Sequence, residues 1–135
     1  MKNTFRLLTF GLVLTSMVQL TGCAAAALGG AAAGAAGAVA YSDRGAKSDV
    51  KGDTQSINQK AEAVFSDLSI QTTGTQSKEN GERELTGKSG DKEITIQMSP
   101  AANGTTHVEV VAKEGTVKWN KDYAKALLSK IVDKT

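Results

Sequence analysis

Apolar and polar side chains alternate along this chain with two different periods, which separate predicted helices from predicted strands. Residues 53–68 and 121–133 have the 3.6-residue period of an amphipathic helix. Their apolar faces consist of Ile57, Ala61, Val64, Phe65 and Leu68 in the first helix and Ala124, Leu127, Leu128 and Ile131 in the second. Asn120 is a suitable N-cap for the second helix. The first helix has two candidate starts, either Asp53 as the N-cap or Ser56 in a capping box with Gln59.

Between these helices the period changes to two, which is typical of half-buried strands. We predict four strands, and three turn motifs separate them: Asn80-Gly81, Gly90-Asp91 and Asn103-Gly104. A short edge strand is predicted near residues 46–51, and the alternation resumes for a few residues at Val117 and Trp119. One sheet face is apolar and consists of Ile70, Leu85, Ile94, Ile96, Met98, Val108 and Val110.

These elements predict an α+β fold for a single domain that spans residues 43–135. We expect a two-layer sandwich in which an antiparallel meander of about four strands carries an N-terminal and a C-terminal helix on one face. Both helices should lie on the same side because the apolar face of the sheet cannot remain uncovered in water.

Residues 1–22 have the pattern of a secretory signal peptide. Lys2 and Arg6 precede an apolar run from 7 to 20, which is shorter than the ~20 residues that span a membrane. The motif Leu20-Thr21-Gly22-Cys23 that follows resembles the lipobox of bacterial lipoproteins. This resemblance implies cleavage before Cys23, a diacylglycerol on its sulfur and an acyl chain on the new amino terminus. We expect lipidation at Cys23 and no other cofactor.

Residues 23–42 are rich in alanine and glycine and are predicted to be a tether between the lipid and the domain. An alternative is a helix that associates through small residues such as Gly30 and Gly34, but the segment has few strongly apolar side chains. Ala24 follows the cysteine, whereas an Asp there commonly retains lipoproteins of Gram-negative bacteria in the inner membrane. We therefore expect an outer-membrane protein that faces the periplasm or the cell surface.

Charge and motif content exclude several function classes. Cleavage of the signal removes two of the 16 basic residues, and the 14 that remain equal the 14 acidic ones. This balance does not favour nucleic-acid binding. Cys23 is the only cysteine and His107 the only histidine, so we expect neither a disulfide within the chain nor a zinc site. Phosphate-loop, dinucleotide and nucleophile-elbow motifs are absent. We predict no catalytic residues, no metal site and no enzymatic activity.

Phe65, Trp119 and Tyr123 are the candidate binding residues of the predicted domain. They either belong to the core or line an apolar pocket between the helices and the sheet, with a Tyr hydroxyl at its mouth. Trp119 precedes the cap Asn120, so we expect it to pack against Ala124 as a hydrophobic staple.

Two functions remain as hypotheses. The first is a membrane-anchored interaction module that binds an unknown envelope or host protein. The second is a carrier of a small apolar ligand. We expect the domain itself to be monomeric, because both helix faces and the apolar sheet face are buried within it.

Several segments together resemble a known family. They are the Ala/Gly-rich leader that ends at Ala40-Tyr41, the helix at residues 61–68, the strand end at Gly115 and the closing helix with Leu127, Leu128 and Ile131. In these the chain resembles a family of small bacterial lipoproteins of unknown function, closest to a Francisella lipoprotein. The implied shape is similar to helix-grip folds, in which helices close over a curved antiparallel sheet that holds apolar ligands. This chain is shorter than most such proteins, which argues against a large cavity.

Overall fold

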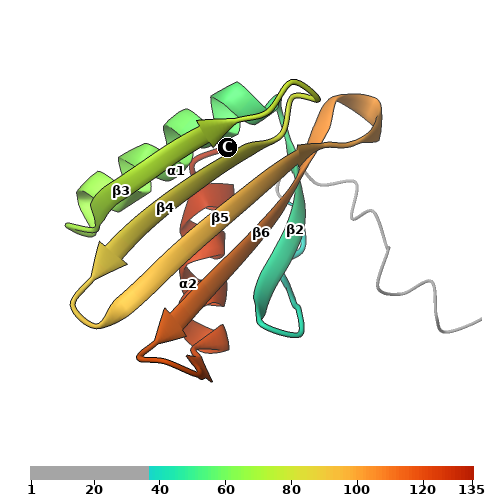
Figure 1. Cartoon of the computed structure of the whole chain (residues 1–135). Helices are drawn as coiled ribbons and strands as arrows, with labels where there is room; N and C mark the ends of the chain where they lie inside the picture. The colour runs from blue at the N-terminus through green and yellow to red at the C-terminus, as the bar shows by residue number, and fades with distance from the viewer. Residues whose placement is uncertain (1–36) are drawn as a thin grey trace, which may run out of the picture.

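The computed structural model describes residues 37–135, which form one antiparallel sheet and two helices (Figure 1). The helices are α1 (Thr54–Asp67) and α2 (Lys121–Asp133). The strands are β1 (Ala40–Tyr41), β2 (Gly45–Lys51), β3 (Gln71–Ser77), β4 (Arg83–Ser89), β5 (Lys92–Pro100), β6 (Thr105–Glu114) and β7 (Lys118–Trp119). A 3₁₀ turn, Ala102–Gly104, precedes β6. The predicted α+β class is confirmed.

The sheet has seven strands, so the prediction of about four was wrong in number. Its order is β1-β2-β6-β5-β4-β3, and β7 pairs with the end of β6. The four strands from β3 to β6 form the expected meander. The additional strands lie beyond β6, where β2 pairs with residues 105–111 and β7 pairs with Lys113 and Glu114. The edge strand predicted near residues 46–51 is present as β2, and β7 lies where the alternation was predicted to resume. Strand β1 has only two residues, too few for a periodic pattern to reveal it.

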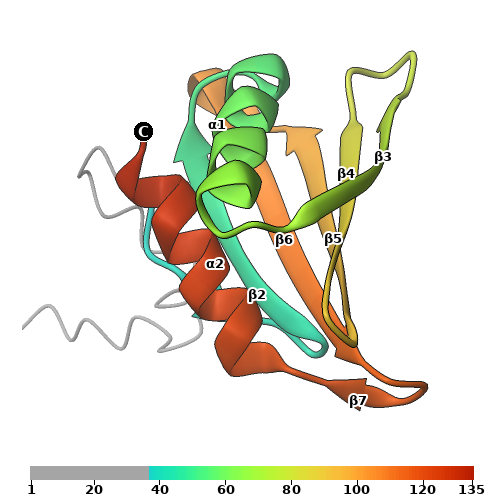
Figure 2. The ribbon, with the colours of Figure 1, turned by 90° about the vertical axis from the view of Figure 1, so that its left-hand side faces the viewer.

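Both helices lie on one side of the sheet, as Figure 2 shows. Helix α1 covers β4 and β5, whereas α2 covers β2 and β6. The side chains between the layers are almost fully buried, and they are Ala46, Val50, Ile57, Ala61, Val64, Phe65, Ile70, Leu85, Ile94, Ile96, Met98, Val108, Val110, Ala112, Ala124, Leu127, Leu128, Ile131 and Val132. The molecule is therefore a two-layer sandwich with one covered and one exposed sheet face.

The helix starts are defined by side-chain caps. The carboxylate of Asp53 accepts a hydrogen bond from the backbone N–H of Ser56 at 2.8 Å, which identifies Asp53 as the N-cap of α1. At the start of α2, the Asn120 side-chain oxygen accepts from the backbone N–H of Tyr123 at 3.0 Å. The predicted cap at Asn120 is confirmed.

The distance between α1 and the sheet depends on a glycine in β4. Gly87 points toward α1, and a Cβ atom there would lie 2.5 Å from Cε2 of Phe65 and 2.9 Å from Cγ2 of Ile70. The aromatic ring therefore rests on the backbone of β4. Any larger residue at this position would push the helix away from the sheet.

The sheet begins at Ala40, within the segment predicted to be the tether. The Tyr41 hydroxyl donates to Oδ1 of Asp122 at 2.8 Å, and Lys125 Nζ lies 4.5 Å from the centroid of the Tyr41 ring. This hydrogen bond to a carboxylate raises the pKa of Tyr41 above its ordinary value. Strand β1 is thus attached to both the sheet and α2. The predicted signal peptide, Cys23 and the tether up to residue 36 lie outside the described residues.

Gly87→Ala tests the seating of α1 on β4. Because the added methyl group collides with Phe65, we expect the free energy of unfolding to fall by about 1–3 kcal/mol. Phe65→Leu should make room for it, so the double variant should lose less than the sum of the single losses. Urea unfolding of the four proteins measures this. Strictly additive losses would contradict the contact.

Candidate functional site

The three aromatic candidates do not line a common pocket. Phe65 is only 1% exposed and lies in the core against Gly87. Tyr123 lies at the margin of α2, where Lys92 Nζ is 6.0 Å from its ring centroid. Trp119 is 39% exposed, and the guanidinium carbon of Arg44 lies 5.7 Å from its ring. Each ring therefore has a different environment.

The predicted staple between Trp119 and Ala124 is wrong because β7 determines where the indole points. Trp119 is paired with Lys113, which follows the inward-facing Ala112 and so lies on the outer sheet face. Directly paired residues share a face, so the Trp119 ring is also on the outer face. Ala124 is fully buried under α2, on the opposite side of the sheet.

Two hollows in the described residues both open at the surface. One has a volume of about 230 Å³ beside the β3–β4 hairpin, and Lys78, Arg83 and Ser99 contribute to its wall. The other has a volume of about 240 Å³ and lies where the ends of α1 and α2 meet, next to Leu68 and Lys130. Neither lies between the helices and the sheet, where the inward side chains are buried against each other.

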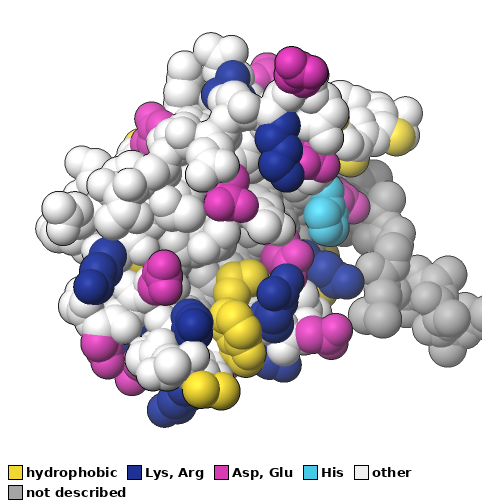
Figure 3. Space-filling view, viewed as in Figure 1, with side chains coloured by type: hydrophobic (Ala, Val, Ile, Leu, Met, Phe, Trp, Pro, Cys, Tyr) yellow, Lys and Arg dark blue, Asp and Glu magenta, His cyan; other side chains and the backbone are white. Residues whose placement is uncertain are grey.

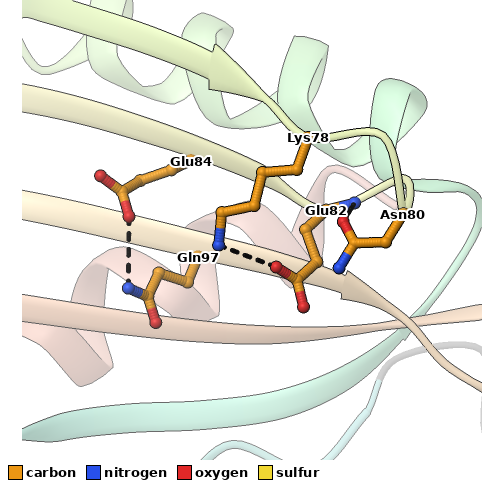
Figure 4. Close-up of polar contacts among 5 residues, drawn as sticks. All are labelled: Lys78, Asn80, Glu82, Glu84 and Gln97. Atoms are coloured by element: carbon orange, nitrogen blue, oxygen red, sulfur yellow. Dashed lines mark hydrogen bonds and ion pairs between the residues drawn. The ribbon is translucent and has the colours of Figure 1, made fainter.

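The hairpin hollow is lined by charged and polar groups (Figure 4). Lys78 Nζ donates to Oε2 of Glu82 at 2.9 Å, and Gln97 Nε2 donates to Oε2 of Glu84 at 3.2 Å. The contact with Glu82 raises the pKa of Lys78. The same contact lowers the pKa of Glu82, and Asn80 lowers it further. Lys78 and Glu82 neutralise each other, and the remaining wall is mostly charged or polar, so the hollow is a polar surface feature rather than an apolar ligand site.

His107 lies in a row of polar residues across the outer sheet face. Asp49 of β2 and Ser99 of β5 are its partners in the register on either side. His107 Nδ1 lies 2.7 Å from Oδ1 of Asp49, and both side chains are exposed. Serine, histidine and aspartate are the residue types of a nucleophilic triad, but within the described residues no hydrogen bond joins Ser99 to His107. The row is best described as an exposed cross-strand pair with a neighbouring serine.

The two edges of the sheet differ in how they are protected. At one edge, β2 carries Lys47, Asp49 and Lys51 and is partly covered by β1. At the other edge, β3 has β4 as its only partner within residues 37–135, and its sequence Gln-Thr-Thr-Gly-Thr-Gln-Ser contains no charge and no proline. Charged side chains and proline are the usual means of preventing strand addition at an edge. A register shift between Thr72 and Gly74 is the only irregularity in the pairing of β3 with β4.

Hydrogen bonding along β3 shows which backbone groups face this open edge. The backbone N–H of Lys78 donates to the carbonyl of Glu82 at 2.8 Å, which marks this pair as hydrogen-bonded. Hydrogen-bonded pairs alternate with non-hydrogen-bonded pairs in an antiparallel ladder. Ser77 and Thr75 therefore direct their N–H and C=O groups outward, whereas those of Gln76 point toward β4. The amino-acid sequence alone does not reveal this site, because an edge is defined by the partners that a strand lacks in the assembled sheet.

Neither helix within residues 37–135 has the length and apolarity to cross a bilayer. In the same part of the chain, no cluster of three or more His, Cys, Asp and Glu side chains is placed to hold a metal ion.

Comparison with known proteins places most of the chain in one family. The model of a family described as "Protein of unknown function (DUF3568)" matches residues 6–133. No curated protein matches the chain.

Because Trp119 is partly exposed, its removal should have little effect on the stability of the domain. Trp119→Ala should lower the free energy of unfolding by at most about 1 kcal/mol, because the indole is only partly buried. A fully buried aromatic ring would cost ~3–5 kcal/mol. Leu128→Ala is the matched control, and we expect it to cost about 2–5 kcal/mol because Leu128 is completely buried. Equal losses in urea unfolding would show that the indole is buried after all.

Proposed function

We propose that this chain, which belongs to the DUF3568 family of unknown function, is a bacterial lipoprotein that acts as a non-enzymatic interaction module. It is anchored in the outer membrane through Cys23 and presents its domain to an envelope or host protein. Its bacterial origin and its likeness to a Francisella lipoprotein are part of this proposal, and they rest on the leader and the Ala/Gly-rich segment.

The anchor is supported by the order of features before the domain. A basic start, an apolar run and the motif Leu20-Thr21-Gly22-Cys23 follow one another at the spacing of a lipoprotein signal. A single acyl chain gives only reversible binding, whereas two or three hold a protein stably on a bilayer. Ala24 after the cysteine supports transport to the outer membrane.

The open edge at β3 is the observation that carries the interaction role. Thr75 and Ser77 direct backbone donors and acceptors outward along an uncharged strand. An extended segment of another protein can pair with such an edge, because main-chain hydrogen bonds supply affinity and neighbouring side chains supply specificity. The partner we propose is therefore an extended segment of an envelope or host protein.

The alternative role, a carrier of a small apolar ligand, has less support. A carrier of the helix-grip type needs space between the helices and the sheet, and ligand sites commonly have ~300–1,000 Å³. Here the Phe65 ring rests on Gly87, and the inward-facing side chains around it are buried. The two hollows described above lie elsewhere and are lined largely by charged residues.

Cys23→Ala tests the anchor. Because the thiol is the only acyl acceptor in the lipobox, we expect the variant to remain uncleaved or to leave the membrane fraction. Incorporation of labelled palmitate into the protein measures this. Label that still enters the Cys23→Ala protein would contradict the proposal.

Thr75→Pro tests the β3 edge. Proline removes an N–H that points outward and leaves the bonds between β3 and β4 in place, so the domain should stay folded. After chemical cross-linking in its native envelope, we expect a partner to be recovered with the wild-type protein and lost from this variant. Ser66→Lys, an exposed change on α1, is the control and should retain the partner. A partner recovered equally with all three proteins would show that β3 is not the binding edge.

A further inference from the structure

Two of the four large exposed hydrophobic side chains in residues 37–135 lie at the end of the domain where β6 turns into β7. We call Val117, Trp119, Arg44 and Lys118 the tip cluster. Val117 is 79% exposed and Trp119 is 39% exposed. Figure 3 shows hydrophobic side chains gathered in the lower part of the outer sheet face, with Lys and Arg side chains beside them. Nothing in the fold requires an apolar residue in the exposed turn at Val117.

Basic residues lie next to these apolar side chains, one of them over the Trp119 ring and two of them in the neighbouring sequence. Arg44 lies over the Trp119 ring at 5.7 Å, and Lys118 and Lys121 flank it in sequence. Within residues 37–135, none of these three basic residues forms an ion pair.

The nearby carboxylates, by contrast, have partners within the domain. Asp122 accepts from Tyr41 at 2.8 Å, Glu114 accepts from Asn120 at 3.2 Å, and Asp91 pairs with Lys92 at 3.4 Å. Asp43 is the remaining carboxylate next to Arg44. Within residues 37–135 none of these carboxylates forms an ion pair with Arg44, Lys118 or Lys121, so these three cations can attract an external negative charge.

We propose that the tip cluster binds the surface of an anionic phospholipid bilayer, and that this bilayer is the membrane in which Cys23 is anchored. The second half of this inference rests on the proposed lipoprotein function. Trp side chains are enriched at the membrane–water interface, where an amphipathic ring lies at headgroup depth. Lys and Arg near an anionic surface add electrostatic attraction.

The size of the cluster favours a bilayer over a protein partner. A stable protein interface buries about 800 Å² on each side around a central apolar patch. One exposed valine and one partly exposed indole do not provide such a patch.

A lipid surface requires less area because the anchor already holds the domain close to it. Sixteen residues, from Ala24 to Val39, separate the anchored cysteine from β1, and they can span at most about 58 Å. Within this distance the effective concentration of the surface is high, so weak contacts are sufficient.

Trp119 is the only tryptophan of the chain and therefore reports on the tip cluster alone. The experiment uses the full lipidated protein in vesicles of phosphatidylglycerol and phosphatidylcholine, with and without brominated acyl chains. We expect a blue shift of the Trp119 emission and loss of its intensity to the brominated lipid. High salt or Lys118→Glu should reduce this quenching, because charge at the surface is screened or reversed.

A reporter at another position is the matched control. Leu68 is also an exposed apolar residue, 37% exposed, but it lies near Lys130 and Lys134 at the far end of α2. Leu68→Trp in a Trp119→Phe background should remain unquenched in the same vesicles.

Three results would overturn the inference. They are absence of Trp119 quenching, equal quenching at both positions, and a spectral shift that requires added envelope protein. Mass spectrometry of the same protein distinguishes the failures, since a missing acyl group refutes the anchor and an intact one refutes only the tip contact.

Discussion

The structure depends on the burial of one apolar face of the sheet. The inward-facing rows of β2, β6, β5 and β4 would expose a continuous hydrophobic surface, and two helices cover it in turn. Helix α1 reaches the backbone of β4 only because Gly87 leaves room for Phe65. Helix α2 covers the other half, and Tyr41 ties β1 to its first turn.

This arrangement determines which surfaces remain for other molecules. The helices cover the inward-facing rows of β2, β4, β5 and β6, and the space between the layers is filled by side chains. The outer face with its polar rows, the bare edge of β3 and the tip cluster around Trp119 remain. The β3 edge and the tip cluster lie on opposite sides of the sheet. Strand β3 forms one edge, whereas β7 pairs with β6 on the same side as β2, toward the other edge. A domain held to a membrane at the tip cluster can still offer the β3 edge to a partner.

Local patterns predicted the parts of the fold that local interactions determine. The two helices, the cap at Asn120 and the meander follow from periods and turns that a few neighbouring residues define. The pairing of β2 with β6 joins two strands that α1, β3, β4 and β5 separate in the sequence, so no local pattern reveals it. The contact between Asp49 and His107 was missed for the same reason. Trp119 was misplaced because its orientation depends on pairing with Lys113. The open edge of β3 is a property of the assembled sheet, so the sequence alone does not predict it. Lipidation at Cys23 concerns a motif outside the described residues and stays a prediction.

Amide hydrogen exchange in the purified lipidated chain tests the openness of β3 most directly. The N–H of Thr75 points away from β4 and should exchange almost as fast as in an unfolded peptide. The N–H of Gln76 points toward β4 and should be protected together with the central strands. Protection of Thr75 equal to that of Gln76, with no partner present, would show that another part of the chain covers this edge and would contradict the proposed binding site.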